Sequence, residues 1–310
     1  MKYILFWSTY DKEKDRSIKN WKTKDIELSP FHKLTLASYI KHGLDVNLYT
    51  YQNINSPNIP KGINLFDADE LLPRIEAFNA LEQDHSIAIV SDCVRINAAC
   101  KLNGIIIDMD AIILKPFPEI GSFYSSMPAK RTGGFAPKWG SAHPPMKVWD
   151  NSWDGKALTA FPVKVGNSNR DNMEKLARHI RIMLNNPPKK SDWTSILWTI
   201  KKFINHDNEA EVYSPIYNCP VPSWLHKGKC YSLESPSRLD GKTQLFGHTL
   251  PSHEEIFNNT YVVQHFFESA FSESKTVDED FWATVPEDCF LAKEANHILG
   301  DNWKMILNES

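Results

Sequence analysis

The chain has 310 residues, of which 42% are hydrophobic and 24% are charged, and its formal net charge is -3 at pH 7. This composition is typical of a folded globular protein and excludes a disordered or fibrous one. The slight negative charge also argues against a nucleic-acid-binding protein, which usually carries a basic surplus.

The chain shows no targeting or membrane signal. The apolar run Met1–Trp7 is too short for a signal peptide and is typical of a first buried strand. No apolar run approaches the length of a membrane span. The five cysteines form no CxxC pair and no zinc-site spacing, which favours reduced, structural thiols. We therefore expect a cytoplasmic protein, with contact at the inner face of the membrane or secretion without a cleaved signal left open.

The first third of the chain alternates strand and helix patterns, as a parallel α/β layer does. Ser29 is suited to cap a helix and Pro30 to stand in its first turn, while Gly43 is a usual residue just past a helix end. The expected elements are a strand at 3–7, a helix from Ser29 to His42, a strand at 45–51, a loop at 53–62, a helix at 86–102, and strands at 105–107 and 111–114.

The rest of the chain gives weaker patterns. Residues 128–156 are irregular and rich in Gly, Pro and Trp, which predicts an insertion or lid. Further elements are expected as a strand at 156–165, a helix at 172–185, a helical stripe at 192–204, a strand at 260–263 and an aromatic-containing tail around Trp303. We expect one domain over 1–310, made of a nucleotide-sugar-binding half (1–127), the insertion (128–156) and an acceptor-side half with the tail (157–310).

Two aspartates follow the apolar strand at 105–107. Open α/β sheets bind ligands at the carboxyl ends of their strands, and alternate residues of an extended chain point to one side, so Asp108 and Asp110 can face one cation. Oxygen ligands favour Mg²⁺ or Mn²⁺. Asp92 and Arg95 are three apart on the preceding helix and share a face, a spacing that is also typical of a surface ion pair.

These residues resemble the core of a known enzyme family. The matching runs are Ser91-Asp92-Cys93-Val94-Arg95, Asn103-Gly104-Ile105-Ile106-Ile107-Asp108-Met109-Asp110 and Leu114-Lys115-Pro116. They are similar to the DxD core of the glycosyltransferases that include bacterial capsule and lipopolysaccharide enzymes and yeast Och-type mannosyltransferases. The glucosylating domains of large clostridial toxins are more distant relatives. Asn103 replaces the first glycine of the usual Gly-Gly, and asparagine tolerates the left-handed conformation.

The resemblance implies a GT-A fold, in which a Rossmann-like nucleotide-binding half has a mixed central sheet flanked by helices and a C-terminal acceptor-side region follows. It implies that Asp92 and Arg95 hold the ribose and sugar hydroxyls of the donor. Asp110 would bind the metal directly as a catalytic residue, and Asp108 would contact both ribose and metal. Trp7 matches a family aromatic near the base, where it would stack on uracil.

A histidine motif near the end of the family domain has a similar run here, Val263-Gln264-His265-Phe266-Phe267-Glu268-Ser269. The resemblance implies that His265 is a third metal or diphosphate contact, with the catalytic Glu268 or the donor-binding Ser269 beside the leaving group. A histidine at the edge of the core after a strand is the structural alternative.

The function implied is a metal-dependent, retaining hexosyltransferase with Mn²⁺ or Mg²⁺ as cofactor. It would move a hexose or N-acetylhexosamine from a nucleotide sugar, expected to be a UDP-sugar, to a glycan or lipid-linked glycan in bacterial surface polysaccharide synthesis. A secreted effector that glycosylates a host protein is the main alternative. A nucleotide-sugar hydrolase, or a phosphatase with Asp108 as nucleophile, would normally carry this motif at its first strand. A non-catalytic sugar-binding module would not need Arg95 and Asp110.

Overall fold

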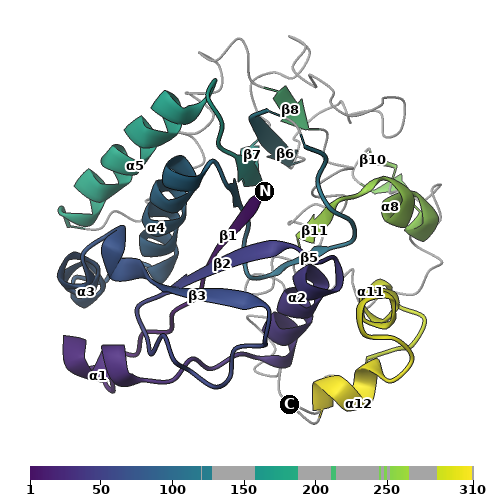
Figure 1. Cartoon of the computed structure of the whole chain (residues 1–310), viewed down its shortest axis with the longest axis horizontal. Coiled ribbons are helices and arrows are strands. Elements are labelled where there is room, and N and C mark those ends of the chain that lie inside the picture. Colours follow the sequence, from purple (N-terminus) through teal and green to yellow (C-terminus); the bar gives the residue numbers. More distant parts are fainter. Residues whose placement is uncertain are drawn as a thin grey trace.

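The central feature is a mixed sheet. The computed structural model describes residues 1–119, 121–127, 158–187, 211–213, 244–245, 248–249, 252–264 and 285–308. Within these ranges the largest sheet has seven strands in the order β3-β2-β1-β4-β7-β6-β8 (Figure 1). Their bounds are β1 (Lys2–Phe6), β2 (Asp45–Thr50), β3 (Ile63–Asp67), β4 (Ile105–Ile106), β6 (Phe123–Met127), β7 (Leu158–Lys164) and β8 (Glu211–Tyr213).

The first four strands along this sheet are parallel. β3, β2, β1 and β4 run in one direction, with Ile4 of β1 paired to Ile106 of β4. β7 is antiparallel to β4 and to β6, and β8 is parallel to β6. The fold is therefore mixed α/β, and the carboxyl ends of its four parallel strands meet at one edge. In open α/β sheets that edge is where ligands bind.

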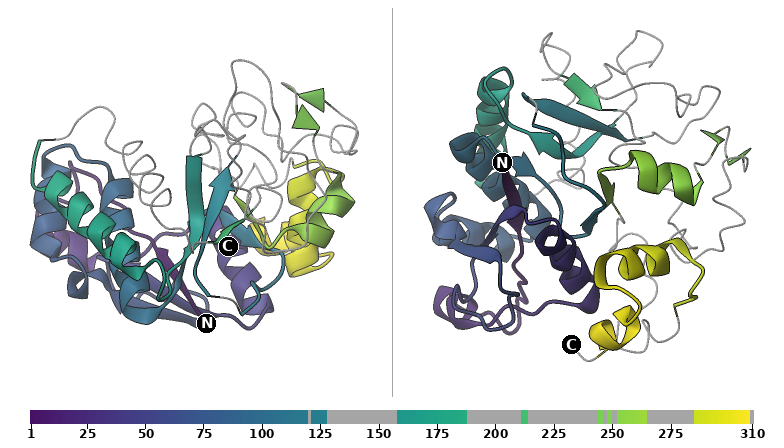
Figure 2. Two further views of the ribbon diagram at one scale, coloured as in Figure 1. Left: turned by 90° about the horizontal axis from the view of Figure 1, so that it is seen from above. Right: turned by 45° about the vertical axis from the view of Figure 1, so that its right-hand side comes forward.

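Helices cover both faces of the sheet (Figures 1 and 2). Side chains alternate along the strands: Ile4 and Ile106 face the cluster that contains α4, while Tyr3 and Ile105 face α2. The bounds are α1 (Ile18–Thr23), α2 (Pro30–Lys41), η1 (Ala68–Glu70), α3 (Arg74–Glu82), α4 (Ile87–Leu102), α5 (Arg170–Leu184), α8 (His253–Asn259), α11 (Phe290–Leu299) and α12 (Trp303–Asn308). None of the described helices is long and apolar enough to cross a membrane.

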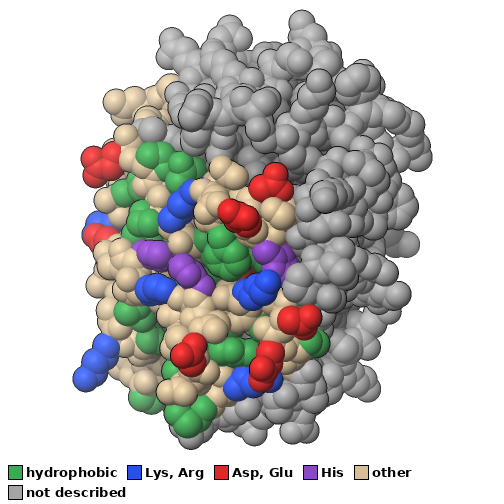
Figure 3. Space-filling view, turned by 90° about the vertical axis from the view of Figure 1, so that its right-hand side faces the viewer, with side chains coloured by type: hydrophobic (Ala, Val, Ile, Leu, Met, Phe, Trp, Pro, Cys, Tyr) green, Lys and Arg blue, Asp and Glu red, His purple; other side chains and the backbone are tan. Residues whose placement is uncertain are grey.

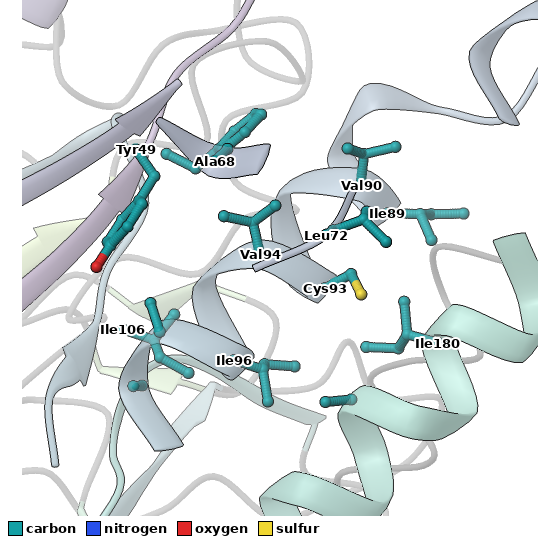
Figure 4. Packing of buried hydrophobic residues seen from close by; sticks show 14 of the residues in the cluster. Tyr49, Ala68, Leu72, Ile89, Val90, Cys93, Val94, Ile96, Ile106 and Ile180 are labelled. Carbon is teal, nitrogen blue, oxygen red and sulfur yellow. The ribbon is translucent and has the colours of Figure 1, made fainter. Parts of the chain in front are cut away.

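Helix α4 is buried between the sheet and α5 (Figure 4). It is capped by Ser86 and ends at Asn103, whose φ of 54° and ψ of 43° are left-handed, as expected for asparagine at this position. Arg170 donates to the carbonyl of Cys100 and to the side chain of Asn103, which secures this helix end. A Cβ at Gly104 would lie 2.7 Å from Cγ1 of Ile4, so the turn into β4 has no room for a larger residue.

The C-terminal helices form a further layer on the outer face of α2 (Figure 2). Phe31 and Leu34 of α2 share a buried cluster with Phe290 of α11 and with Trp303, which is 5% exposed. The tail expected around Trp303 is helical, and Trp303 itself is buried. Trp303 begins a helix that packs into the core, because the apolar residues of α11 and α12 recur at helical spacing and need a partner surface.

Lysine side chains donate hydrogen bonds to carbonyls in the last turns of α11 and α8. Lys41 donates to the carbonyl of His297 in the last turn of α11, and Lys115 donates to the carbonyl of Asn258 in the last turn of α8 at 2.6 Å. A cation is favourable at a helix C-terminus, where carbonyls have no helical partner. Figure 3 shows the face that carries these helices, on which histidine side chains and Lys or Arg side chains lie side by side.

Most elements expected in the first half are confirmed within a residue or two. The helix from Ser29 is α2, with Ser29 as its cap and Pro30 in its first turn, and Gly43 has a φ of 62°. The strand expected at 156–165 is β7 and the helix at 172–185 is α5. Elements that were not predicted include α1, β3, α3, β6, α8, β9 (Gln244–Leu245) and β10 (His248–Thr249), the last two of which pair with each other. The strands β5 (Ala111–Ile113) and β11 (Val262–Gln264) were expected, but their antiparallel pairing was not. The insertion at 128–156 and the stripe at 192–204 lie outside the described residues.

Candidate active site

Arg95 of α4 links two of the predicted site aspartates. Its Nη2 donates to Asp92 Oδ1 at 2.6 Å, and its Nη1 donates to Asp108 and, at 2.9 Å, to the carbonyl of Ile107. The side chains of Arg95, Asp92 and Asp108 are 6%, 15% and 31% exposed, respectively. The helix spacing of Asp92 and Arg95 therefore produces a buried pair joined to the end of β4, and not a surface ion pair.

Burial controls the electrostatics of this cluster. It raises the pKa of Asp92 to about 6, with the charge of Asp108 adding to the shift and the guanidinium of Arg95 opposing it. Burial also disfavours the charged form of Arg95, but Asp108 and Asp92 outweigh it and raise the pKa of the guanidinium. Arg95 is therefore a permanent cation that holds two carboxylates at the carboxyl end of β4.

Asp108 and Asp110 lie on either side of a buried methionine. Met109 is 5% exposed and packs with Tyr3 and Leu5 in the cluster under α2, whereas both aspartates are partly exposed. That both carboxylates face one cation stays a prediction. Their predicted roles with metal and ribose stay predictions.

Three of the predicted site residues at this edge are acidic. Asp92, Asp108 and Asp110 bring three carboxylates, and Arg95 brings one guanidinium. Among the residues that the structure describes, no group of three or more His, Cys, Asp or Glu side chains is arranged to hold a metal ion. Two carboxylates nevertheless fit Mg²⁺ or Mn²⁺, because such ions are usually held by one or two protein carboxylates with water and substrate phosphates completing the shell.

Tyr39 of α2 is buried against Tyr3 of β1. Its ring is fully buried and its hydroxyl has no hydrogen-bond partner in the described part of the chain. Burial raises its pKa well above the usual range, and Tyr3, Asp108 and Asp110 add to that shift.

Trp7 stands at the same edge, one residue after β1. Because β1 and β4 are adjacent and parallel, Trp7 and Asp108 follow neighbouring strand ends. The indole Nε1 donates to the carbonyl of Glu27 at 2.9 Å, and the ring lies against His32 with centroids 3.9 Å apart. Trp7 is partly exposed and so is placed to meet a ligand, while base stacking itself stays a prediction.

The loop after Trp7 is held by buried polar groups. Ser8 Oγ accepts from the main-chain N–H of Tyr51 at 3.0 Å, and Gln52 Oε1 accepts from the main-chain N–H of Thr9 at 2.9 Å. Ser8 and Gln52 are 5% and 1% exposed. Buried polar groups with satisfied hydrogen bonds rigidify the segment that they join, so the carboxyl ends of β1 and β2 form one fixed platform.

Three predicted residues, His265, Glu268 and Ser269, lie outside the described residues, and their roles stay predictions. The chain leading to them is placed. β11 (Val262–Gln264) pairs antiparallel with β5 (Ala111–Ile113), and Gln264 is opposite Ala111. The last described residue before His265 is thus paired with the residue that follows Asp110.

Sequence reasoning missed His32, which stands at this edge, and Tyr39, which packs against Tyr3 near the start of β1. Tyr39 carries no local signal, because its burial arises from packing between α2 and the sheet. His32 has one: it stands three residues after the cap Ser29, where a capping box places a side-chain acceptor. Histidine is unusual at that position, and this spacing was available from the sequence.

Comparisons with known proteins give little more. No protein-family model matches the chain, and no curated protein matches its sequence. Among solved structures, the PaToxG glycosyltransferase matches with a TM-score of 0.35 and 14% identity, over 66% of this chain and 73% of that chain. A likeness at this level carries no argument about activity, so the function has to be argued from the residues at the carboxyl edge of the mixed α/β sheet.

Proposed function

We propose that this chain is a glycosyltransferase that binds a nucleotide sugar at the carboxyl edge of β1 and β4. The observation that carries the proposal is the buried Asp92–Arg95–Asp108 cluster with Asp110 two residues further on. Burying charged groups lowers stability, and carboxylates with a perturbed pKa at a ligand-binding edge are candidates for function. The resemblance of residues 91–116 to the DxD core supports the same activity.

Within this proposal Arg95 is a positioning residue. Both of its terminal nitrogens are engaged by Asp92, Asp108 and the carbonyl of Ile107, and it is 5% exposed. It fixes the two carboxylates before the donor arrives, so that no reorganisation is needed when they accept hydroxyl groups of the ribose and the sugar.

Asp108 and Asp110 would hold the divalent cation, Mn²⁺ or Mg²⁺. Such an ion neutralises a nucleoside diphosphate as it leaves and so lowers the barrier to sugar transfer. The pairing of Gln264 with Ala111 supports a role for the segment after β11, and His265 stays a prediction as a further ligand. The chain itself supplies the fixed carboxylates, the rigid loop after β1 and the aromatic surface of Trp7.

The finer assignments rest on the resemblance. They are transfer of a hexose or N-acetylhexosamine from a UDP-sugar with retention of configuration, and a hydroxyl acceptor on a glycan or lipid-linked glycan of a bacterial surface polysaccharide. No residue stands out as a covalent nucleophile in the described part of the chain, so attack by the acceptor on the same face as the leaving group is the working mechanism.

The test is hydrolysis and transfer with a panel of nucleotide sugars, measured with Mn²⁺ and with excess chelator. We expect one donor to turn over only with the metal, and Asp110→Asn to abolish that turnover. Asp45→Asn is the matched control, because Asp45 is an exposed residue at the start of β2 and so lies at the opposite edge of the sheet. Full activity in chelator would refute the metal assignment, and no turnover of any donor would refute the transferase.

A further inference from the structure

His32 has one fixed protonation pattern, set by the cap of α2. Ser29 main-chain N lies 3.3 Å from His32 Nδ1 and Ser29 Oγ lies 2.9 Å from it, while the main-chain N–H of His32 donates to Ser29 Oγ. A main-chain N–H can only donate, so Nδ1 is an acceptor. A neutral imidazole carries one ring proton, which must then be on Nε2.

The ring is kept neutral and in place by its surroundings. Burial lowers the pKa of His32 to about 4, so the imidazole is uncharged near pH 7. Trp7 covers part of the ring at a centroid distance of 3.9 Å and an interplanar angle of 48°, and Trp7 is itself fixed by its bond to Glu27. Nε2–H makes no hydrogen bond within the described part of the chain, and His32 is partly exposed.

The topology puts this donor at the ligand edge. α2 follows β1 and precedes β2 in a parallel pair, so its first turn lies at the carboxyl end of β1, where Trp7 is. The two ends of the edge differ in character. Asp108 and Asp110 provide a charged end that suits a cation and a diphosphate, whereas Trp7 and His32 provide an uncharged aromatic end with a single donor.

We propose that His32 is a specificity-determining residue that reads the nucleobase of the donor, with Nε2–H donating to a carbonyl oxygen on the edge of the base. The inference rests on the proposed function and names the residue that would select the base. Phosphate would be better held by a cation, while an aromatic surface with a neutral donor suits a flat, uncharged base that carries an acceptor. Bases with an oxo group opposite Nε2–H are then preferred to bases with an amino group there, because an amino group would leave Nε2–H facing another donor.

The experiment compares nucleoside diphosphates that differ by oxo and amino groups, UDP with CDP and IDP with ADP, by titration calorimetry in Mn²⁺. In the wild-type protein we expect the oxo member of the pair that binds to be tighter by about tenfold, the size of one lost hydrogen bond that leaves a partner unpaired. His32→Phe keeps a ring against Trp7 but has no donor, so its preference should fall to about onefold with the affinity for the amino member unchanged. His32→Gln, which preserves the capping box and carries an amide donor, should restore part of the preference.

A measurement without any variant guards against a folding defect. Long-range ¹H–¹⁵N spectra of histidine-labelled protein distinguish the two neutral tautomers, and His32 should show a proton on Nε2 from pH 6 to 8. A proton on Nδ1, or an oxo preference that survives in His32→Phe, overturns this inference alone. Absence of binding by all four diphosphates to the wild-type protein overturns the proposed function as well.

Discussion

Arg95 Nη2 lies 2.6 Å from Asp92 Oδ1, one turn earlier on α4, and both side chains are nearly enclosed by protein. The same guanidinium reaches across to Asp108 at the end of β4, so the pair joins a helix to a strand as well as joining two charges. Removing the guanidinium would leave two carboxylates without their counter-charge, whereas Arg95 would still have Asp108 as a partner if Asp92 were neutral. The contribution of this cluster to the free energy of unfolding can therefore be measured by experiments that need no substrate.

Arg95→Ala should lower the free energy of unfolding by about 3–5 kcal/mol, because it leaves Asp92 and Asp108 without their buried counter-charge. Arg181→Ala is the matched control. Arg181 also pairs with a carboxylate through two bonds, to Glu76 at 2.6 and 2.8 Å, but its side chain is 48% exposed. Its loss should be at most about 1 kcal/mol. Equal losses in urea unfolding of the two variants would contradict a buried cluster.

Asp92→Asn should stabilise the protein more at pH 7.5 than at pH 5. Burial raises the folded-state pKa of Asp92 from 3.8 to about 6, so its contribution to stability is greatest below pH 3.8 and is lost as the pH rises through 6. Asparagine does not lose this contribution, and each pKa unit corresponds to about 1.4 kcal/mol.

Asp11→Asn is the control of opposite sign. Hydrogen bonds from the main chain of Glu13 and from Lys14 lower the pKa of the exposed Asp11, so its contribution is present above pH 3.8 and lost on acidification. Thermal melts of both variants from pH 5 to 7.5 separate the cases. A gain for Asp92→Asn that is the same at every pH would show that Asp92 does not titrate in this range.

Trp7→Ala should weaken nucleotide binding by roughly 1–3 kcal/mol if the indole stacks on the base. Its effect on stability should be small, because Trp7 is partly exposed. Trp21→Phe is the reference for a core position, since Trp21 is fully buried and should lose stability while the folded variant keeps its affinity. Calorimetric titration and thermal melts on both proteins give the answer. A Trp7→Ala protein that melts early but binds normally would place Trp7 in the core.

Trp303→Ala should destabilise the chain by about 3–5 kcal/mol, because the side chain is buried with α2 and α11. Met305→Ala, two residues further on and 52% exposed, should change stability by less than about 0.5 kcal/mol. Chemical unfolding of the two variants is sufficient. A Trp303→Ala protein as stable as wild type would contradict the packing of Trp303 against α2 and α11.

Elements with local signals were predictable from the sequence. α2 has a cap, a proline in its first turn and a glycine after its end, so its bounds depend on neighbours in the chain. α3 begins after Pro73 without a side-chain cap, and its apolar residues show little separation into faces, so the sequence gives no pattern for it. Its position is set instead by packing, including the bond between Arg181 of α5 and Glu76.

In the candidate site, too, contacts set by local spacing were predictable and contacts set by tertiary packing were not. Helix spacing predicts that Asp92 and Arg95 share a face, and that is observed. The contact between Arg95 and Asp108 joins two elements across a turn, and only the strand-end argument and the family resemblance brought those residues together beforehand. The contact between Trp7 and His32 depends on where α2 begins relative to β1, which no local pattern specifies.

The positions along the chain of the segments that cover the two faces of α2 affect how fast each face is buried during folding. The inner face of α2 packs on strands that are close to it in the chain, but Phe31 and Leu34 on its outer face are covered by α11 and α12, which follow much later in the chain. Contacts between distant segments form slowly, because a long loop must close first. Until α11 and α12 pack against α2, Phe31 and Leu34 therefore lack the apolar partners that cover them in the folded chain, and exposed apolar surface of this kind favours aggregation during folding.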